Sequence, residues 1–240
     1  MSAGARPRVS VVVFPGSNCD HDAVHAVEAT IGADARPVWH AGTDLGRPDL
    51  VILPGGFSYG DYLRCGALAR FSPVMEAVRD FAARGGPVLG ICNGFQVLCE
   101  AGLLPGALLL NSGQRFRCED VFVRVETIRT PFTAELTKGD VLRLPIAHGD
   151  GNWRAEAATF DDVTTHDQIV FRYCDAAGAR ATGANPNGSL DDVAGVCNRE
   201  RNVVGLMPHP ERASEAMLGN ADGARLFRSF ANGLLLGRTA

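Results

Sequence analysis

Hydrophobic positions follow two different periodicities through the first hundred residues. Short apolar runs rich in β-branched residues end at proline or glycine, as buried strands do. Between them, apolar residues recur every three or four positions, which indicates helices with one buried face. These patterns predict strands at residues 9–14, 35–39, 50–53 and 87–91 and helices at residues 20–31, 73–84 and 93–101.

The order of the elements predicts the fold class. Alternating strands and helices build a parallel sheet with helices on both faces. Beyond residue 110 the apolar runs follow one another closely, which favours an antiparallel portion added to the sheet, before a last helix at 223–236. We assign these closely spaced strands to residues 116–127, 141–147, 169–173, 193–197 and 203–207. The sequence thus predicts a doubly wound, mostly parallel α/β sheet in a single domain over residues 1–240.

Composition and charge exclude several classes of protein. The 240 residues are 46% hydrophobic and carry a formal net charge of −4, which excludes disorder as the dominant state. There is no basic footprint for nucleic acid, since Lys138 is the only lysine and acidic residues outnumber basic ones. No apolar run is long enough to span a membrane, and residues 1–8 lack the apolar stretch of a signal peptide.

Cysteine usage favours a reducing compartment. The chain has seven cysteines, and none forms a C-x-x-C pair, so neither a disulfide framework nor a zinc site is indicated. We therefore expect a cytoplasmic protein in which most thiols are small buried hydrophobes. The seven are Cys19, Cys65, Cys92, Cys99, Cys118, Cys174 and Cys197.

Cys92 is distinguished from the other cysteines by its surroundings. It lies in the motif G-x-C-x-G at residues 90–94, between a predicted strand and a predicted helix, as in a nucleophile elbow with Cys in place of Ser. Glycines allow the close backbone approach that such a turn requires. Free N–H groups of the helix that begins at Asn93 would stabilise a thiolate and an oxyanion. The alternative is a core cysteine followed by ordinary turn glycines.

A nucleophilic thiolate also needs a base and a group that orients the base. His209 follows the predicted strand at 203–207, has proline on both sides and precedes Glu211 by two residues. We expect the prolines to keep this segment extended, so that the imidazole and the carboxylate project to the same side. The sequence therefore predicts a Cys92–His209–Glu211 triad, against the alternative of a surface loop with a chance acid–base pair.

Other motifs carry less chemistry. Residues 54–58 form a glycine turn at the end of a strand expected beside the elbow strand, where a backbone amide could approach a substrate carbonyl. A plain glycine turn is the alternative there. His21 and His25 have a spacing that suits a metal pair, but no third ligand follows, so a solvated helix face is the better interpretation. The sequence contains neither G-x-x-x-x-G-K-[ST] nor G-x-G-x-x-G, so we expect no nucleotide cradle in this chain.

Together these motifs resemble those of the class I, or triad, glutamine amidotransferases. The signature of that superfamily is G-x-C-x-G-x-Q, found here at residues 90–96, followed far downstream by H-P-E, found at 209–211. Residues 14–20, 54–64 and 145–149, with the segment around Asn111 and Arg115, are similar to the glutaminase subunits of phosphoribosylformylglycinamidine synthases. The resemblance covers nearly the whole chain and implies a flavodoxin-like fold.

The resemblance implies glutamine hydrolysis through a thioester. Cys92 would attack the side-chain amide carbon, His209 would carry the proton to departing ammonia, and Glu211 would orient His209. Backbone amides near Gly56 and Asn93 would form the oxyanion hole, and water would then cleave the thioester.

The resemblance also implies where glutamine binds. Gln96, His148 and Gly149 match positions that hold the substrate in the superfamily. Asn111 and Arg115 are weaker candidates for the same pocket.

The partners implied are a large ATP-dependent synthetase subunit and a small accessory subunit. The synthetase would use the ammonia to convert formylglycinamide ribonucleotide to formylglycinamidine ribonucleotide in de novo purine biosynthesis, with ATP and Mg²⁺ on that subunit. For this chain the expectation is no cofactor, no metal, no nucleic acid and no membrane.

Two rival functions remain open at this point. One is a related cysteine hydrolase, such as a peptidase or deglycase, which would not need Gln96 or the H-P-E segment. The other is a regulatory subunit that has kept the fold and lost activity, although all three triad residues are present.

Overall fold

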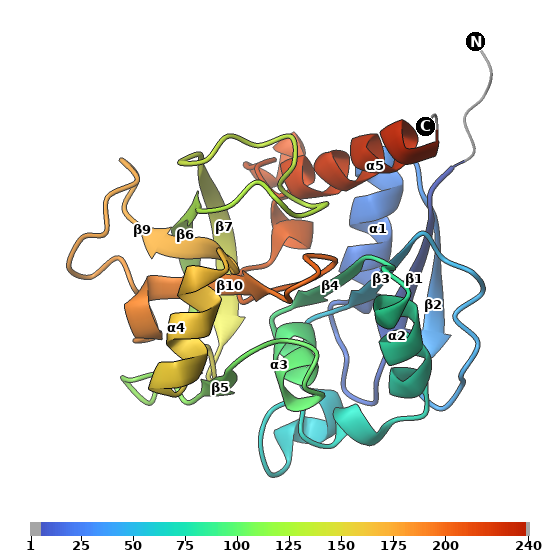
Figure 1. The fold of residues 1–240 in the computed structure, drawn as a ribbon, viewed down its shortest axis with the longest axis horizontal. Helices are drawn as coiled ribbons and strands as arrows, with labels where there is room; N and C mark the ends of the chain where they lie inside the picture. The colour runs from blue at the N-terminus through green and yellow to red at the C-terminus, as the bar shows by residue number, and fades with distance from the viewer. Residues whose placement is uncertain (1–5, 239–240) are drawn as a thin grey trace.

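A nine-stranded sheet forms the centre of the molecule. The computed structural model describes residues 6–238, so the first five and last two residues of the predicted domain lie outside the described part. Strand order in the sheet is β2-β1-β3-β4-β11-β10-β9-β6-β7 (Figure 1). The bounds are β1 Arg8–Val13, β2 Asp34–Trp39, β3 Leu50–Leu53, β4 Val88–Ile91, β6 Arg117–Val125, β7 Val141–His148, β9 Ile169–Cys174, β10 Val193–Cys197 and β11 Val203–Leu206.

Half of the sheet is parallel, as the alternation of strands and helices predicts. β1 pairs in parallel with β2 and β3, and β4 pairs in parallel with β3 and β11. Every residue of β3, β4 and β11 is buried, as expected for strands covered on both faces. Because parallel strands end at the same edge, the segments that follow β3, β4 and β11 meet there.

Helices cover both faces of the parallel half (Figure 1). On one side α1 packs against β1, β2 and α5, and on the other α3 packs against β3, β4 and β11. Gly32 ends α1 in the left-handed conformation with φ 62°, a common glycine cap. The helix bounds are α1 Asp20–Ile31, α2 Val74–Ala83, α3 Asn93–Glu100, α4 Ala157–Thr165 and α5 Ala224–Arg238.

The other half of the sheet is the predicted antiparallel portion. β10 pairs antiparallel with β11 and β9, and β6 pairs antiparallel with β9 and β7. In β7, residues alternate between half-buried and buried, so this strand packs tightly on one face only. A separate small sheet joins β5 (Ala107–Leu109) to β8 (Asn152–Arg154), and neither strand was expected from the sequence.

The position of β11 corrects one expectation. The run at 203–207 was grouped with the antiparallel strands because it follows them closely along the chain. In the structure β11 returns to the parallel half, pairing with β4 in the register Gly90↔Gly205 and Ile91↔Leu206. The strand that precedes His209 therefore lies directly beside the strand that precedes Cys92.

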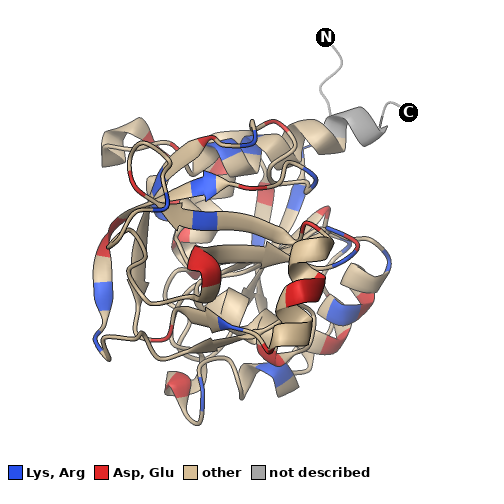
Figure 2. Ribbon diagram, turned by 60° about the vertical axis from the view of Figure 1, so that its left-hand side comes forward, with Lys and Arg blue, Asp and Glu red and all other residues tan. Residues whose placement is uncertain are grey.

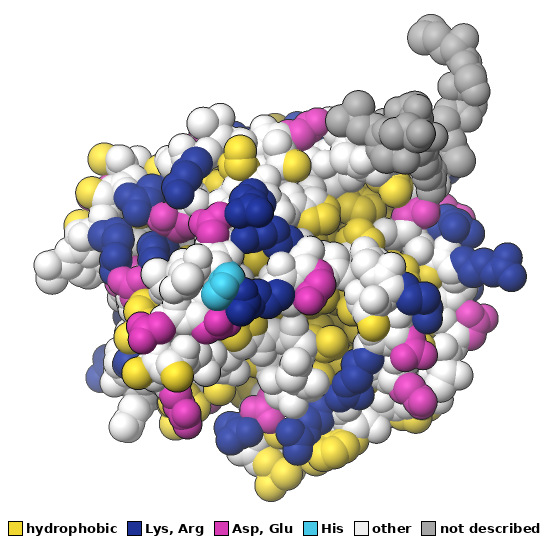
Figure 3. Space-filling model, in the orientation of Figure 1, with side chains coloured by type: hydrophobic (Ala, Val, Ile, Leu, Met, Phe, Trp, Pro, Cys, Tyr) yellow, Lys and Arg dark blue, Asp and Glu magenta, His cyan; other side chains and the backbone are white. Residues whose placement is uncertain are grey.

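Charged side chains are dispersed over the molecule. Figure 2 shows basic and acidic residues interspersed along the ribbon, and the face in Figure 3 has no large area of one sign. Within residues 6–238, no helix combines the length and the apolar character needed to cross a bilayer.

Candidate active site

Cys92 occupies a strained turn between β4 and α3. Its backbone has φ 50° and ψ −104°, a conformation that non-glycine residues rarely adopt and that commonly marks functional sites. Its side chain is buried, and Sγ donates a weak hydrogen bond to the Ala147 carbonyl at 3.7 Å. The turn thus holds the sulfur at the first residue before a helix N-terminus.

The glycines on either side of Cys92 are required by close packing. A Cβ at Gly94 would lie 1.9 Å from the Leu53 carbonyl oxygen, and a Cβ at Gly90 would lie 2.8 Å from the Gly94 carbonyl oxygen. Neither contact is possible without movement of backbone. The prediction that these glycines permit close backbone approach is confirmed.

Adjacent strand ends bring the predicted triad together. The Cys92 N–H donates to the Leu206 carbonyl at 2.8 Å, which continues the pairing of β4 with β11. His209 follows β11 by three residues, and its own N–H donates to the Pro145 carbonyl of β7 at 2.8 Å. Backbone hydrogen bonds among three segments that are distant in sequence therefore fix the position of His209.

His209 and Glu211 form a buried pair. His209 Nδ1 lies 2.6 Å from Glu211 Oε1, and both residues are almost completely buried. Burial alone would lower the pKa of His209, but the Glu211 carboxylate and the Cys92 thiol raise this pKa well above its usual value. The imidazole is thus close enough to the Cys92 sulfur to interact with it electrostatically. Its Nε2 has no hydrogen bond of ordinary length and angle, so that nitrogen is free to exchange a proton.

The backbone that carries this pair is not extended as expected. Residues Pro210–Ala213 form a 3₁₀ helix with proline at its first position. Proline lacks an N–H, but the first residues of a helix need no internal donor, so proline starts a helical turn easily. The expectation that the prolines forbid helix was wrong, although His209 and Glu211 are nevertheless side by side.

The glycine turn after β3 lies beside His209. A Cβ at Gly55 would lie 2.7 Å from His209 Cε1, so only glycine fits there. Gly56 has φ 141° and forms an isolated bridge with Ser17. Within residues 6–238, no hydrogen bond is donated by the Gly56 amide, as expected for an amide that is available to a substrate.

Asn93 and Gln96 connect the elbow to neighbouring segments through side-chain hydrogen bonds. Asn93 Oδ1 accepts from the Ser58 N–H at 3.2 Å, and Asn93 Nδ2 donates to Gln96 Oε1 at 2.8 Å. Gln96 Nε2 then donates to the Asp150 carbonyl at 2.7 Å. Both ends of the Gln96 amide are therefore occupied by internal partners.

Asn111 makes several hydrogen bonds that hold together the turn after β7. Its Nδ2 donates to the carbonyls of Arg115 and His148, both at 2.9 Å. Its Oδ1 accepts from His148 Nδ1 at 3.1 Å and from the Gly151 N–H at 2.9 Å, and its N–H donates to the Gly149 carbonyl at 2.8 Å. The predicted positions Asn111, His148 and Gly149 are thus brought together.

Arg115 contacts the other predicted glutamine-binding residues through its backbone. Its side chain is exposed, and its carbonyl is what contacts Asn111. In the described part of the chain its guanidinium makes no hydrogen bond or ion pair.

His148 is buried and neutral near pH 7. Burial, reinforced by the positive charges of His209 and Arg117, lowers the pKa of His148 to about 4. Its Nε2 is buried without a partner. A neutral imidazole therefore lies close to the strongly basic His209.

A cavity of about 180 Å³ opens onto this edge of the sheet. The exposed rings of Phe57 and Phe116 lie 6.4 Å apart between their centroids and form part of its wall. The lining residues are Asn18, Cys19, Gly56, Phe57, Phe116, Ala147, His209 and Arg212.

Cys19 was not predicted to belong to the site. It precedes α1, and Arg212 Nη2 lies 3.0 Å from its sulfur while the same thiol interacts with His209. The sequence contained a usable signal: β1 is parallel to β3, so the segment after β1 reaches the same edge as Gly55 and Gly56.

A second thiol, that of Cys65, lies among acidic groups. Cys65 interacts with the carboxyl groups of Asp61 and Asp150, and burial together with these charges raises the pKa of Cys65 well above its ordinary value. Burial also raises the pKa of Asp61. These groups face a different cavity, of about 710 Å³, from the one that His209 lines.

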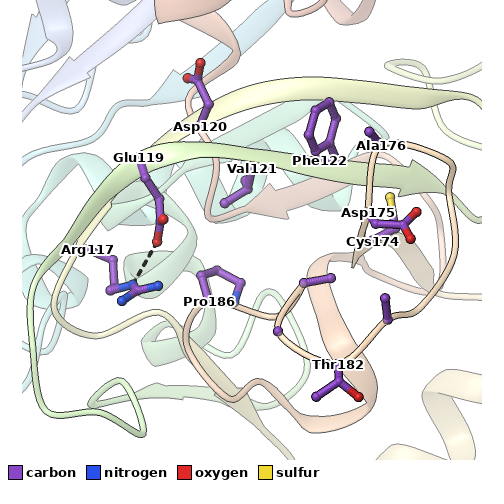
Figure 4. A pocket seen from close by; sticks show the side chains of 13 residues that line it. Arg117, Glu119, Asp120, Val121, Phe122, Cys174, Asp175, Ala176, Thr182 and Pro186 are labelled. Atoms are coloured by element: carbon purple, nitrogen blue, oxygen red, sulfur yellow. Dashed lines mark ion pairs between the residues drawn. The ribbon is translucent and has the colours of Figure 1, made fainter.

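Other predicted or possible sites lie elsewhere. His25 pairs with Glu215 at 2.6 Å, while His21 is almost fully exposed, so the two histidines do not converge. Another cavity, of about 360 Å³, lies between β6 and the loop at 175–186, where Arg117 pairs with Glu119 at 2.8 Å (Figure 4). None of the residues predicted for catalysis or glutamine binding lines it.

Comparison with known proteins agrees with this architecture. The family model described as a CobB/CobQ-like glutamine amidotransferase domain matches residues 6–229, which identifies the class of the fold. PurQ subunits of phosphoribosylformylglycinamidine synthase from Chlorobaculum parvum and Thermomicrobium roseum are 57% and 58% identical over 92% of this chain, covering 88% and 94% of their own lengths.

A solved structure is also similar to this chain. A chain in the structure of PurLQS from Thermotoga maritima superimposes with a TM-score of 0.84 at 45% identity, covering 96% of this chain and 100% of that one. The chain belongs to the PurQ family of glutamine amidotransferases. The predicted fold class and family are both confirmed.

Proposed function

We propose that this chain is the glutaminase subunit of a phosphoribosylformylglycinamidine synthase, with Cys92 as nucleophile, His209 as acid–base and Glu211 as its orienting group. Similarity to PurQ subunits over most of the chain supports the activity. The observation that carries the residue roles is the meeting of two adjacent parallel strands, β4 and β11. They end at a strained cysteine and at a buried His–Glu pair, respectively.

The reaction proceeds in two halves. Cys92 Sγ attacks the side-chain amide carbon of glutamine, and His209 takes the thiol proton and gives it to the nitrogen as the C–N bond breaks. Ammonia leaves and a glutamyl thioester remains. Water then attacks the thioester carbon, His209 takes a proton from that water and returns it to sulfur, and glutamate leaves.

Charge that develops on the carbonyl oxygen needs donors. The amides of Gly56 and Asn93 are the proposed donors, because the first is not engaged elsewhere and the second begins α3 directly after the sulfur. Loss of one such donor would lower turnover on the order of 100-fold or more.

The remaining predicted residues divide into two groups by their contacts. Gln96 and Asn111 are proposed as positioning residues. Their side-chain amide groups already hydrogen-bond to the elbow and to the turn after β7, so they are not free to bind glutamine. His148, Gly149 and Arg115 remain the proposed glutamine-binding positions.

We further propose that ammonia passes directly to a large synthetase subunit, with a small accessory subunit in the assembly. Ammonia released into water near neutral pH would be protonated and no longer nucleophilic, so direct transfer preserves its reactivity. ATP and Mg²⁺ are assigned to the synthetase, and this chain is proposed to need no cofactor of its own. Seven cysteines without a disulfide support a cytoplasmic setting.

The test uses the reconstituted complex. We expect Cys92→Ser to lose glutamine-dependent activity by at least about 10⁴-fold while the complex still uses ammonium salts. Full glutamine-dependent activity in this variant would contradict the mechanism.

A labelling experiment separates this function from a peptidase or deglycase. A glutamine-mimicking diazo ketone should alkylate Cys92, and free glutamine should protect it. Labelling that glutamine does not slow would favour the rival hydrolase. A glutaminase rate that rises when the synthetase subunit is added would support the assembly.

A further inference from the structure

Cys19, His209 and Glu211 form a group that the proposed catalytic cycle does not use as a whole. One potential ligand atom from each, a sulfur, an imidazole nitrogen and a carboxylate oxygen, lies within 4.8 Å of the other two. Their exposed fractions are 2%, 1% and 3%. Within residues 6–238, no other trio of Cys, His, Asp or Glu brings ligand atoms this close.

Two buried atoms of this group have no partner. His209 Nε2 and Glu211 Oε2 are both inaccessible to solvent and make no hydrogen bond. Buried polar atoms in folded proteins are almost always paired, so two unpaired polar atoms on neighbouring side chains indicate that something else binds there. The cavity of about 180 Å³, which Cys19 and His209 line, offers a route for a small ion.

We propose that Cys19, His209 and Glu211 form an inhibitory Zn²⁺ site. A thiolate, an imidazole and a carboxylate match the donor preference of Zn²⁺, and three protein ligands leave a fourth position for water. Zinc–ligand bonds of about 2.0–2.3 Å place the ligands of a tetrahedral site roughly 3.3–3.8 Å apart. The widest of the three separations therefore needs to close by at most about 1 Å, and the 2.6 Å contact between His209 Nδ1 and Glu211 Oε1 would open if both atoms became ligands.

Binding would displace the proton on Cys19 and the proton on the His209 nitrogen that becomes a ligand. The Cys19 thiol now donates to Asn18 Oδ1 at 3.2 Å, and zinc would take the place of its proton, which is released to solvent. Arg212, whose Nη2 lies 3.0 Å from the sulfur, can keep its hydrogen bond to a sulfur that has become negative. Thiolate and carboxylate together balance the charge of the ion.

The inhibitory consequence rests on the proposed function. A zinc ion that engages His209 and Glu211 would take the imidazole away from the Cys92 thiol and from the departing ammonia, without any contact to Cys92. Zinc binding itself does not depend on the catalytic roles. An experiment can therefore disprove the metal site without disproving the proposed function, and the reverse.

Metal binding is measured first, on the full chain without substrate. Co²⁺, a spectroscopic substitute for Zn²⁺, should give a thiolate-to-cobalt charge-transfer band in the wild type that added Zn²⁺ removes and that Mg²⁺ does not. The band should persist in Cys92→Ala and in the control Cys197→Ala, a buried cysteine of β10. It should vanish in Cys19→Ala, with Cys19→Ser as a variant of nearly unchanged volume if the alanine variant does not fold.

Inhibition is measured second. Zn²⁺ should inhibit the wild-type glutaminase, and Cys19→Ala should raise the inhibitory concentration, relative to its own basal rate, by more than the 10- to 100-fold typical of losing an outer-shell partner. A band that is lost in Cys92→Ala and retained in Cys19→Ala would overturn the proposal, as would no cobalt band at all. A Cys92→Ala variant that still hydrolyses glutamine would instead overturn the proposed function and leave the metal site standing.

Discussion

The parallel and antiparallel halves of the sheet contribute to the candidate site in different ways. In the parallel half, β3, β4 and β11 are buried throughout and deliver Gly56, Cys92 and His209 from their ends. In the antiparallel half, β7 is buried on alternate residues and contributes carbonyls and a turn.

The triad residues and Asn111 also differ in how completely their polar atoms are hydrogen-bonded. Beside the parallel strand ends, His209 and Glu211 each keep an unpaired buried atom. Beside β7, both side-chain polar atoms of Asn111 are hydrogen-bonded, although Nε2 of the neighbouring His148 is unpaired. Unpaired groups are available for chemistry, whereas paired groups hold a shape. Substitution of His209 or Glu211 should therefore lower the turnover number, and substitution of Asn111 should lower the free energy of unfolding.

The largest effect is expected from Glu211→Gln. The neutral amide cannot balance the positive charge of His209, and its NH2 group can hold the imidazole in the wrong tautomer, so glutaminase turnover should fall about 10²- to 10⁴-fold. The raised pKa of His209 stabilises the fold below pH about 6.5, where the unfolded histidine is also protonated, and this contribution is lost as pH rises through the folded pKa.

Two measurements check this prediction. Steady-state kinetics give the loss in turnover, and urea unfolding of both proteins gives the stability difference as a function of pH. The stability advantage of the wild type over Glu211→Gln should shrink as the solution becomes alkaline. An unchanged turnover would show that Glu211 plays no part in orienting the base.

Gly94→Ala tests whether the elbow depends on backbone contact. The added Cβ would meet the Leu53 carbonyl at 1.9 Å, so we expect a loss of about 3 kcal/mol in the free energy of unfolding. The matched control is Gly233→Ala in α5, where a Cβ has nothing within 4 Å and alanine should stabilise by up to about 1 kcal/mol. Equal effects in the two helices would contradict the contact argument.

Asn111→Ala should remove the side-chain hydrogen bonds that hold together the turn after β7. Several buried partners would lose their hydrogen bonds, which we expect to lower the free energy of unfolding by about 2–3 kcal/mol. Asn232→Ala, at an exposed position of α5, should change it by less than about 0.5 kcal/mol. Denaturant unfolding of the two variants measures both changes. An Asn111→Ala protein as stable as the wild type would show that the turn does not depend on the hydrogen bonds of Asn111.

His148 should make the fold sensitive to mild acid. Its pKa is about 4 when folded, against an ordinary value near 6.5, so between these values the unfolded chain binds a proton that the folded chain does not. Stability should therefore fall as pH falls through this window, by about 2 kcal/mol from pH 6.5 to 5. In His148→Gln this part of the pH dependence should be absent, which unfolding at several pH values would detect.

Local patterns predicted the parallel half well. The strand at 50–53 agrees with β3 at both ends, and the helix predicted at 93–101 is α3 to within one residue, because buried runs and capping glycines are signals contained in the chain itself. Sequence proximity misplaced β11, since the register that pairs it with β4 is fixed by tertiary packing.

The candidate site was predicted less completely than the fold. Cys92, His209 and Glu211 are identifiable from short motifs, whereas the place of Cys19 beside His209 depends on which strands are neighbours. The 3₁₀ turn at Pro210–Ala213 was missed because proline is compatible with the first turn of a helix as well as with extended backbone. The single-domain assignment and the roles of the site residues remain predictions.

The most direct test traps the covalent intermediate. The wild-type protein is mixed with glutamine, quenched in acid within the first turnovers and digested, and the peptides are analysed by mass spectrometry. We expect one glutamyl group on the peptide that contains Cys92 and none on the peptide that contains Cys19. A glutamyl group on Cys19, or ammonia release with no acylated cysteine at any quench time, would contradict the proposed mechanism.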